Sequence, residues 1–158
     1  MEEIQVSKRA LVIKYAALTA AMLIVYFIIM ALFGLVKYSA LRVINYPLIA
    51  FGIFSAIKEI KRKSGQDKIG YLTGFSTGFM IVLATAILFS IFVFIYARFI
   101  NVSFVNVIWP EPYSKDNDMN SLAIGMYIFG ETLIFGVIID FIAMQYFKRD
   151  GGSSEDED

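Results

Sequence analysis

Two acidic residues interrupt the last long apolar segment of the sequence, and they are the first candidates for chemistry. Glu131 and Asp140 are nine positions apart, which on an α-helix separates them by about 13 Å along the axis and by about 180° around it. They therefore cannot share one proton as a carboxylate pair does. An ionised carboxylate in hydrocarbon is costly, so each must be paired, protonated or in contact with water.

Asp140 has a candidate partner in the first apolar segment. Lys14 lies at about the depth expected for Asp140, so we expect an internal Lys14–Asp140 ion pair and a structural role for Asp140. Thr132, Gly136 and Asp140 are spaced by four and share one helix stripe. This stripe should therefore turn toward another helix rather than toward lipid.

Glu131 has no lysine or arginine at its expected depth, only hydroxyl groups such as those of Thr85 and Ser90. We expect it to be largely protonated unless water or a partner reaches it, and Gly130 beside it would let another chain approach closely. Three interpretations stay open. Glu131 is a neutral hydrogen-bonding group between helices, a group that handles protons or cations, or the partner of a base on another subunit.

Glycines recur every fourth residue at the start of the third apolar segment, at Gly70, Gly74 and Gly78. Three missing side chains on one stripe allow another backbone to approach closely. We expect contact with a neighbouring span of the same molecule, with a subunit contact or a lipid or ligand site as alternatives. Gly136 is expected to serve helix packing in the same way.

The composition excludes most familiar enzyme chemistry. The 158 residues contain no histidine and no cysteine, so this chain cannot supply a Ser-His-Asp or Cys-His site, a zinc or iron–sulfur site, or a disulfide. Hydrophobic residues make up 58% and charged residues 18%, against about 45–50% and about 25% in soluble domains. We expect a membrane protein with no catalytic residues, no metal, no cofactor and no nucleic-acid partner.

Four apolar segments must position these residues, at 11–36, 43–57, 69–97 and 122–147. The second is short, and the others are long enough to cross a bilayer. They predict an all-α, four-helix transmembrane bundle that forms a single domain of residues 1–149.

The parts outside the spans are an external loop and a tail. The external loop, residues 98–121, contains Trp109 and Tyr113, whose side chains suit the headgroup level. Its apolar part, residues 102–108, could lie on the membrane surface or dock a partner. The tail, residues 150–158, is acidic and has no apolar residue, so we expect it to be disordered.

Lysine and arginine are concentrated at both termini and in the loop between the second and third segments, which predicts that both termini are cytoplasmic. The N-terminal span is expected to be an uncleaved signal-anchor. The basic side chains of the middle loop serve as a topology anchor in the favoured interpretation. They could also attract anionic lipid headgroups, at about 1 kcal/mol per base. These residues are Lys58, Lys61, Arg62 and Lys63.

Three consecutive parts of the sequence carry a resemblance: the segment from Asn45-Tyr46-Pro47 through Phe51-Gly52-Ile53-Phe54-Ser55-Ala56-Ile57-Lys58, the basic loop, and the glycine-rich entry Ile69-Gly70-Tyr71-Leu72-Thr73-Gly74-Phe75-Ser76-Thr77-Gly78-Phe79. Together they resemble a family of small four-span membrane proteins common in Bacteroidota. That family is known as a domain of unknown function. The resemblance implies a bacterial inner-membrane location and supplies no catalytic residues. The Trp109-Pro110-Glu111-Pro112 stretch and the acidic tail lie outside it.

These observations favour a non-enzymatic accessory or scaffold subunit of a larger inner-membrane assembly, with the lipid bilayer and partner subunits or further copies of the chain as its contacts. The alternative is a small oligomeric transporter or channel in which Glu131 responds to protons or ions. An enzyme acting on lipid or peptide through Glu131, Asp140 or the external acids is the third hypothesis. It is disfavoured because the spans hold no acids paired on one face.

Overall fold

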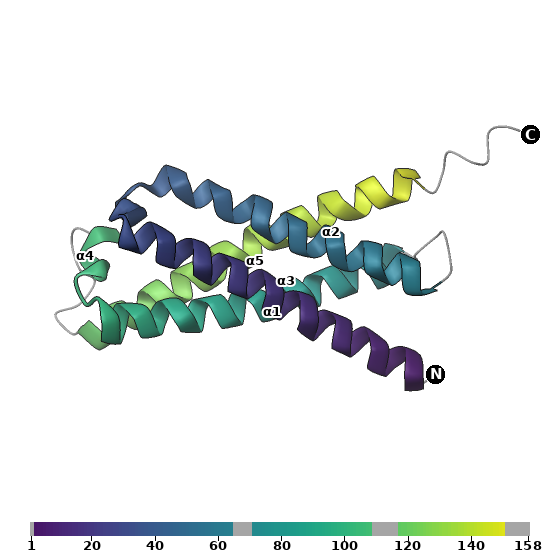
Figure 1. The fold of residues 1–158 in the computed structure, drawn as a ribbon, viewed down its shortest axis with the longest axis horizontal. Coiled ribbons are helices and arrows are strands. Elements are labelled where there is room, and N and C mark those ends of the chain that lie inside the picture. The colour runs from purple at the N-terminus through teal and green to yellow at the C-terminus, as the bar shows by residue number, and fades with distance from the viewer. Residues whose placement is uncertain (1, 65–70, 109–116, 151–158) are drawn as a thin grey trace, which may run out of the picture.

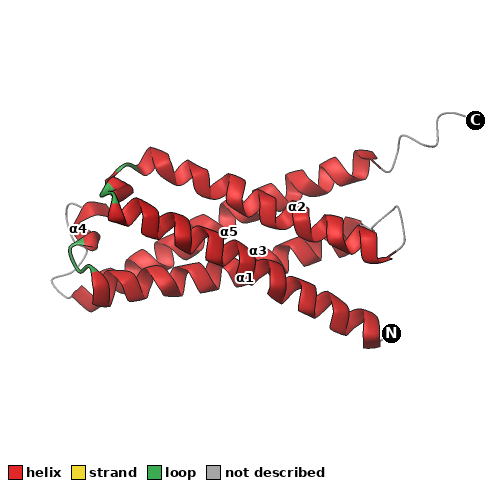
Figure 2. Cartoon of the chain, viewed as in Figure 1, coloured by secondary structure: helices red, strands yellow, loops and turns green. Residues whose placement is uncertain are grey.

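The computed structural model describes residues 2–64, 71–108 and 117–150, in which all regular structure is helical. Four long helices, α1 (Glu2–Leu32), α2 (Asn45–Ser64), α3 (Tyr71–Ile95) and α5 (Asn117–Asp150), form an elongated bundle (Figures 1 and 2). Each overlaps a stretch long and apolar enough to cross a membrane. The predicted fold class is therefore confirmed.

The bundle has two distinct ends. The start of α1 and the end of α5 lie together at one end, here named the terminal end, and α1 joins α2 at the other, here named the hairpin end (Figure 1). Several predicted features lie outside the described residues: Gly70, Trp109, Tyr113, residues 151–158 of the tail and the side chain of Lys63.

The hairpin between α1 and α2 is built from tight turns. Helix α1 ends because Gly34 adopts a left-handed conformation with φ 65°, which glycine reaches without a steric penalty. Two 3-10 helices follow, η1 (Leu35–Lys37) and η2 (Ser39–Ile44). The hydroxyl of Tyr26 on α1 donates a 2.7 Å hydrogen bond to the carbonyl of Leu41, which ties η2 back onto α1.

Helix α2 continues well past its predicted end at residue 57, to Ser64. Its 20 residues span about 30 Å, enough to cross a bilayer. The prediction was too short because lysine, arginine and glutamate end an apolar run without ending a helix. They are good helix formers, and their long side chains can reach away from lipid.

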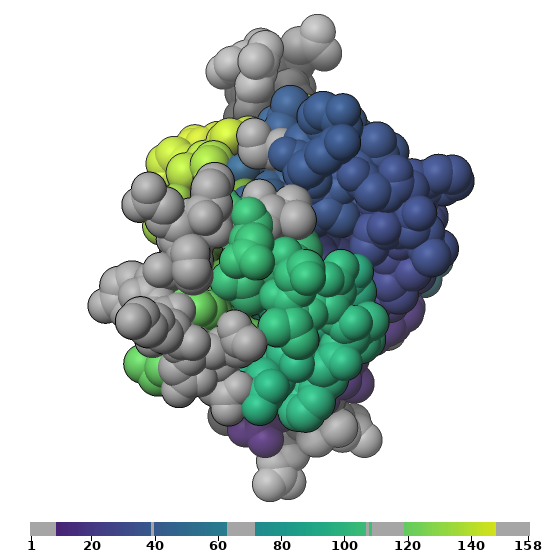
Figure 3. Space-filling view, turned by 90° about the vertical axis from the view of Figure 1, so that its left-hand side faces the viewer, coloured from purple at the N-terminus to yellow at the C-terminus, as the bar shows by residue number. Residues whose placement is uncertain are grey.

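The connection from α3 to α5 folds over the hairpin end. Helix α3 passes into a π-helical turn, η3 (Tyr96–Ile100), and then a short helix, α4 (Phe104–Ile108). Phe104 and Val105 are buried, and the Phe104 ring lies 5.5 Å from the ring of Phe27 on α1. The expectation that residues 102–108 lie on the membrane surface is therefore wrong for Phe104 and Val105. These side chains pack into the bundle, where aromatic rings surround Phe104. Figure 3 looks onto this end and shows η3 and α4 in teal-green beside the blue hairpin residues.

The helices pack in a ring, in the order α1, α2, α5, α3 and back to α1, and α2 also touches α3. Glycines bring α3 and α5 closest together. A Cβ on Gly78 of α3 would overlap the Asp140 side chain, and a Cβ on Gly136 of α5 would overlap Val82. Further along, a Cβ on Gly125 would lie 3.2 Å from Phe94 Cβ. These pairs run in one antiparallel register, so each side chain fills the space left by a glycine on the facing helix.

Gly136→Ala is expected to destabilise the bundle by about 1–3 kcal/mol, because the added methyl group overpacks the contact with Val82. A Val82→Ala change in the same variant should restore most of the loss. The measurement is the thermal unfolding midpoint in detergent. The matched control is Gly130→Ala, since a Cβ at Gly130 meets nothing within 4 Å. Equal effects at Gly136 and Gly130 would contradict the α3–α5 contact.

Candidate functional site

Glu131 is held by side chains from the beginning of the second span. Its Oε1 accepts a 3.3 Å hydrogen bond from the hydroxyl of Tyr46, and its Oε2 lies 3.9 Å from Arg42 Nη1. Tyr46 also stacks on Phe135, one turn further along α5, with ring centres 4.3 Å apart. The hairpin therefore brings a cation and a phenol to a carboxylate for which only hydroxyl partners were expected.

The expected partners of Glu131 are occupied elsewhere. Thr85 donates to the carbonyl of Ala16, and Ser90 donates to the carbonyl of Ile87. The prediction that no base reaches Glu131 is also wrong. Arg42 lies in a loop segment that the sequence placed outside the spans, and η2 turns it back against α5.

The Glu131 group is incompletely hydrogen-bonded. Glu131 Oε2 is buried and has no hydrogen bond among the described residues, and neither has Oδ1 of Asn45. The side chains of Arg42 and Glu131 keep exposed fractions of 21% and 15%. The pair is thus neutral overall, partly open to its surroundings and able to accept further hydrogen bonds.

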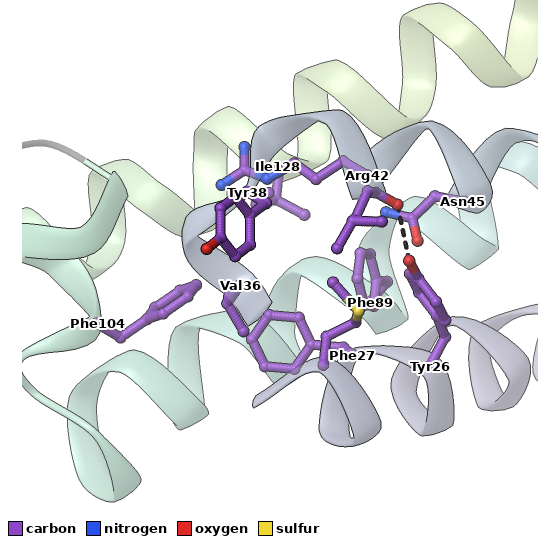
Figure 4. A pocket seen from close by; sticks show the side chains of 11 residues that line it. Tyr26, Phe27, Val36, Tyr38, Arg42, Asn45, Phe89, Phe104 and Ile128 are labelled. Atoms are coloured by element: carbon purple, nitrogen blue, oxygen red, sulfur yellow. Dashed lines mark hydrogen bonds between the residues drawn. The ribbon is translucent and has the colours of Figure 1, made fainter. Parts of the chain in front are cut away.

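A small cavity lies beside this group at the hairpin end. Its volume is about 40 Å³, and Arg42, Asn45 and Tyr26 line it together with apolar side chains. A cavity needs roughly 10–15 Å³ to hold one water molecule, so this one has room for a few. Figure 4 shows Arg42 and Asn45 along one side and Phe27 and Phe104 on the other.

Lys14 pairs with Glu59 and not with Asp140, so the predicted Lys14–Asp140 pair is wrong. Lys14 Nζ lies 2.9 Å from Glu59 Oε2, and the hydroxyl of Tyr15 donates a 2.5 Å hydrogen bond to the same oxygen. The reason is depth along the bundle. Glu59 lies five positions beyond Phe54, whose ring contacts Phe147, so the Lys14–Glu59 pair lies about three turns away from Asp140 along the bundle.

Asp140 is completely buried on α5, with 0% of its surface exposed. Both carboxylate oxygens lack a hydrogen-bond partner within the part of the chain that the structure describes. The carboxylate fills the space over Gly78 of α3. The predicted stripe of Thr132, Gly136 and Asp140 is buried, and its last two members face α3.

The other predicted residues are dispersed. Gly74 is buried on α3, and Lys58 and Arg62 are exposed near the end of α2. The ammonium group of Lys61 lies 5.2 Å from the centre of the Phe147 ring. A role of these bases at lipid headgroups stays a prediction.

The arrangement does not assemble a reactive site from the described residues. Among them, no three acidic side chains gather at distances suited to a metal ion. Glu131 and Asp140 lie in separate environments, one beside a cation and the other beside a glycine. What the site can do chemically is accept hydrogen bonds at Glu131 and bind or release a proton at Asp140.

A family model described as protein of unknown function (DUF4199) matches residues 14–149. The chain belongs to this family. The DUF4199 match includes Lys14, Arg42, Glu59, Glu131 and Asp140, and the family description names no activity. No curated protein and no solved structure gives a significant match to the chain.

Arg42→Met is expected to destabilise the protein by about 1–3 kcal/mol, because it leaves the Glu131 carboxylate without its cation. The double variant Arg42→Met/Glu131→Leu should be more stable than Arg42→Met, since an apolar pair replaces the charges together. Thermal unfolding of the two variants in one detergent makes the comparison. A double variant as unstable as Arg42→Met would argue against the pair.

Glu59→Leu is expected to cost about 1–3 kcal/mol, because it leaves the buried Tyr15 hydroxyl without an acceptor. Lys14→Met should cost much less than Glu59→Leu, because exposed ion pairs contribute little and the Lys14 side chain is 59% exposed. Unfolding midpoints of both variants test this order. A larger loss for Lys14→Met would instead support an essential partner for Lys14 elsewhere, such as Asp140.

Proposed function

We propose that this DUF4199 protein is a non-enzymatic accessory or scaffold subunit of a larger membrane assembly, held in place by helix packing. The observation that carries the proposal is Gly130 on α5, a glycine that does not serve a close contact between helices within the bundle. A Cβ at Gly130 would meet nothing within 4 Å, whereas one at Gly52, Gly78 or Gly136 would overlap a side chain of a neighbouring helix.

The surroundings of Gly130 suit a partner helix. Met126 and Ile134 lie one turn before and after it, with exposed fractions of 67% and 61%. Positions four apart share one helix face, so an apolar face with a gap at Gly130 points away from the bundle. Small residues on such a face allow a second helix to approach closely in lipid.

Glu131 adds a polar contact at the same place. It follows Gly130 in the chain, and its side chain is 15% exposed beside that of Arg42, which is 21% exposed. A serine, threonine or asparagine side chain on a partner helix could hydrogen-bond to the exposed part of the Arg42–Glu131 pair. Interhelical hydrogen bonds of this kind contribute about 0.6–2 kcal/mol in membranes.

The transporter alternative loses its main support. It relied on Glu131 as an unpaired group that responds to protons or ions, and Glu131 lies beside Arg42 and Tyr46. The absence of histidine and cysteine from the sequence supports a non-enzymatic role. The proposed location is the bacterial inner membrane with both termini in the cytoplasm, supported by the distribution of lysine and arginine.

Gly130→Leu is expected to release the protein from its assembly while leaving the isolated chain as stable as the parent. The measurement is native mass spectrometry after gentle detergent extraction, with the protein expressed at its natural level. The matched control is Ala21→Leu, which adds similar bulk to an exposed position of α1. The proposal fails if the parent runs as a single chain, or if Gly130→Leu and the control assemble like the parent.

A further inference from the structure

The most isolated titratable group of the described chain is Asp140. The other two acids within the apolar stretches have partners: Glu59 binds Lys14 and Tyr15, and Glu131 lies beside Arg42 and Tyr46. Asp140 is fully buried, and neither oxygen has a hydrogen bond in the described residues. An isolated carboxylate in such surroundings would be strongly disfavoured if it were charged.

Asp140 lies deep in the bundle. Helices α2 and α5 run in parallel, and Tyr46 contacts Glu131 while the ring of Phe54 contacts that of Tyr146. Asp140 lies between these two levels, beside the middle of α2 (Asn45–Ser64). The distance along α5 to Phe147, where its apolar stretch ends, is about 10 Å.

The facing helix provides space for the carboxyl group and no charge. Gly78 of α3 is the residue under it, and a Cβ there would overlap both the Asp140 carboxyl carbon and its oxygens. Helix α3 contains no aspartate, glutamate, lysine or arginine, and its only titratable side chain is Tyr71 at its first position. The nearby hydroxyl of Thr77 donates to the carbonyl of Thr73 on its own helix.

The charged groups of α2 whose side chains the structure describes are engaged elsewhere or exposed. Glu59 binds Lys14 and Tyr15, and Lys61 lies over the ring of Phe147, two turns beyond Asp140 on α5. Lys58 and Arg62 are exposed. At the hairpin end, Arg42 of η2 and Tyr46 in the first turn of α2 contact Glu131.

We propose that Asp140, seated over Gly78, is a proton-binding site in the interior of the bundle. A metal cation would need several oxygen ligands, and within the described chain no group of three acidic side chains could hold one. A proton needs only the carboxylate itself, and its binding removes the charge from the apolar interior.

Proton binding at this site is coupled to the contact between α3 and α5. When the proton leaves, the carboxylate must gain water or a cation, and at Gly78 even an added Cβ would overlap the carboxyl group. Release therefore requires the two helices to separate locally. The site gives the protein a packing that responds to protons, in addition to the proposed contact with partner subunits, and it does not depend on that contact.

The test is infrared spectroscopy of the full-length protein in lipid nanodiscs at neutral pH and at a series of higher pH values. We expect a band from a protonated carboxyl group that disappears as the pH rises. Asp140 is the only aspartate in the long apolar segments, so the band should shift when the protein is labelled with side-chain ¹³C-aspartate. This measurement needs no variant.

Two matched variants complete the assignment. Asp140→Asn should lose the band, and Glu131→Gln should keep it. The unfolding midpoint of the parent should fall as the pH rises and the proton is lost, and that of Asp140→Asn should stay level over the same range. No protonated-carboxyl band at neutral pH, a band insensitive to the aspartate label, or one lost on adding sodium or potassium at constant pH would overturn the proposal.

Discussion

The close contact between α3 and α5 is the constraint on which the rest of the bundle depends. In lipid there is no hydrophobic force between helices, so association depends on van der Waals contact and on the close approach of backbones. Gly78, Gly125 and Gly136 permit that approach, and their facing side chains fix the register. The hairpin of α1 and α2 then packs onto this pair, with α1 against α3 and α2 against α5.

The placement of charge follows from this arrangement. The α1–α2 hairpin carries both partners of the Lys14–Glu59 pair and brings Arg42 to Glu131. Both pairs thus involve the part of the protein that packs on the outside of the α3–α5 contact. Asp140 lies within that contact, where the facing helix has a glycine and no base. Glu131 and Asp140, the two acids within the apolar stretch of α5, therefore differ in chemistry because they meet different neighbours.

The fold could be predicted from the sequence, because long apolar segments in a membrane have few alternatives to helices that satisfy their own backbone hydrogen bonds. The close contacts of Gly78 and Gly136 with a neighbouring span agree with the glycine spacing. The pairing of Lys14 with Glu59 could also have been predicted from the sequence. In an antiparallel hairpin with a short connection, residues at similar distances from the turn meet, and these two satisfy that condition.

The partner of Glu131 could not be predicted, because depth inside a bundle is set by the neighbouring helices and not by position within one apolar segment. Glu131 is fourteen residues into α5, yet it is level with Tyr46 in the first turn of α2. Helix α5 therefore begins about 20 Å before the level at which α2 begins, beside η3 and α4. An acid near the centre of its own segment thus lies close to the hairpin end, where an arginine from a loop can reach it. Nine residues further on, the same offset places Asp140 beside the middle of α2. Glu131, the acid that the sequence favours for chemistry, is therefore neutralised by an arginine. Asp140, which the sequence favours for a structural role, has no such partner among the described residues and is the acid that binds a proton.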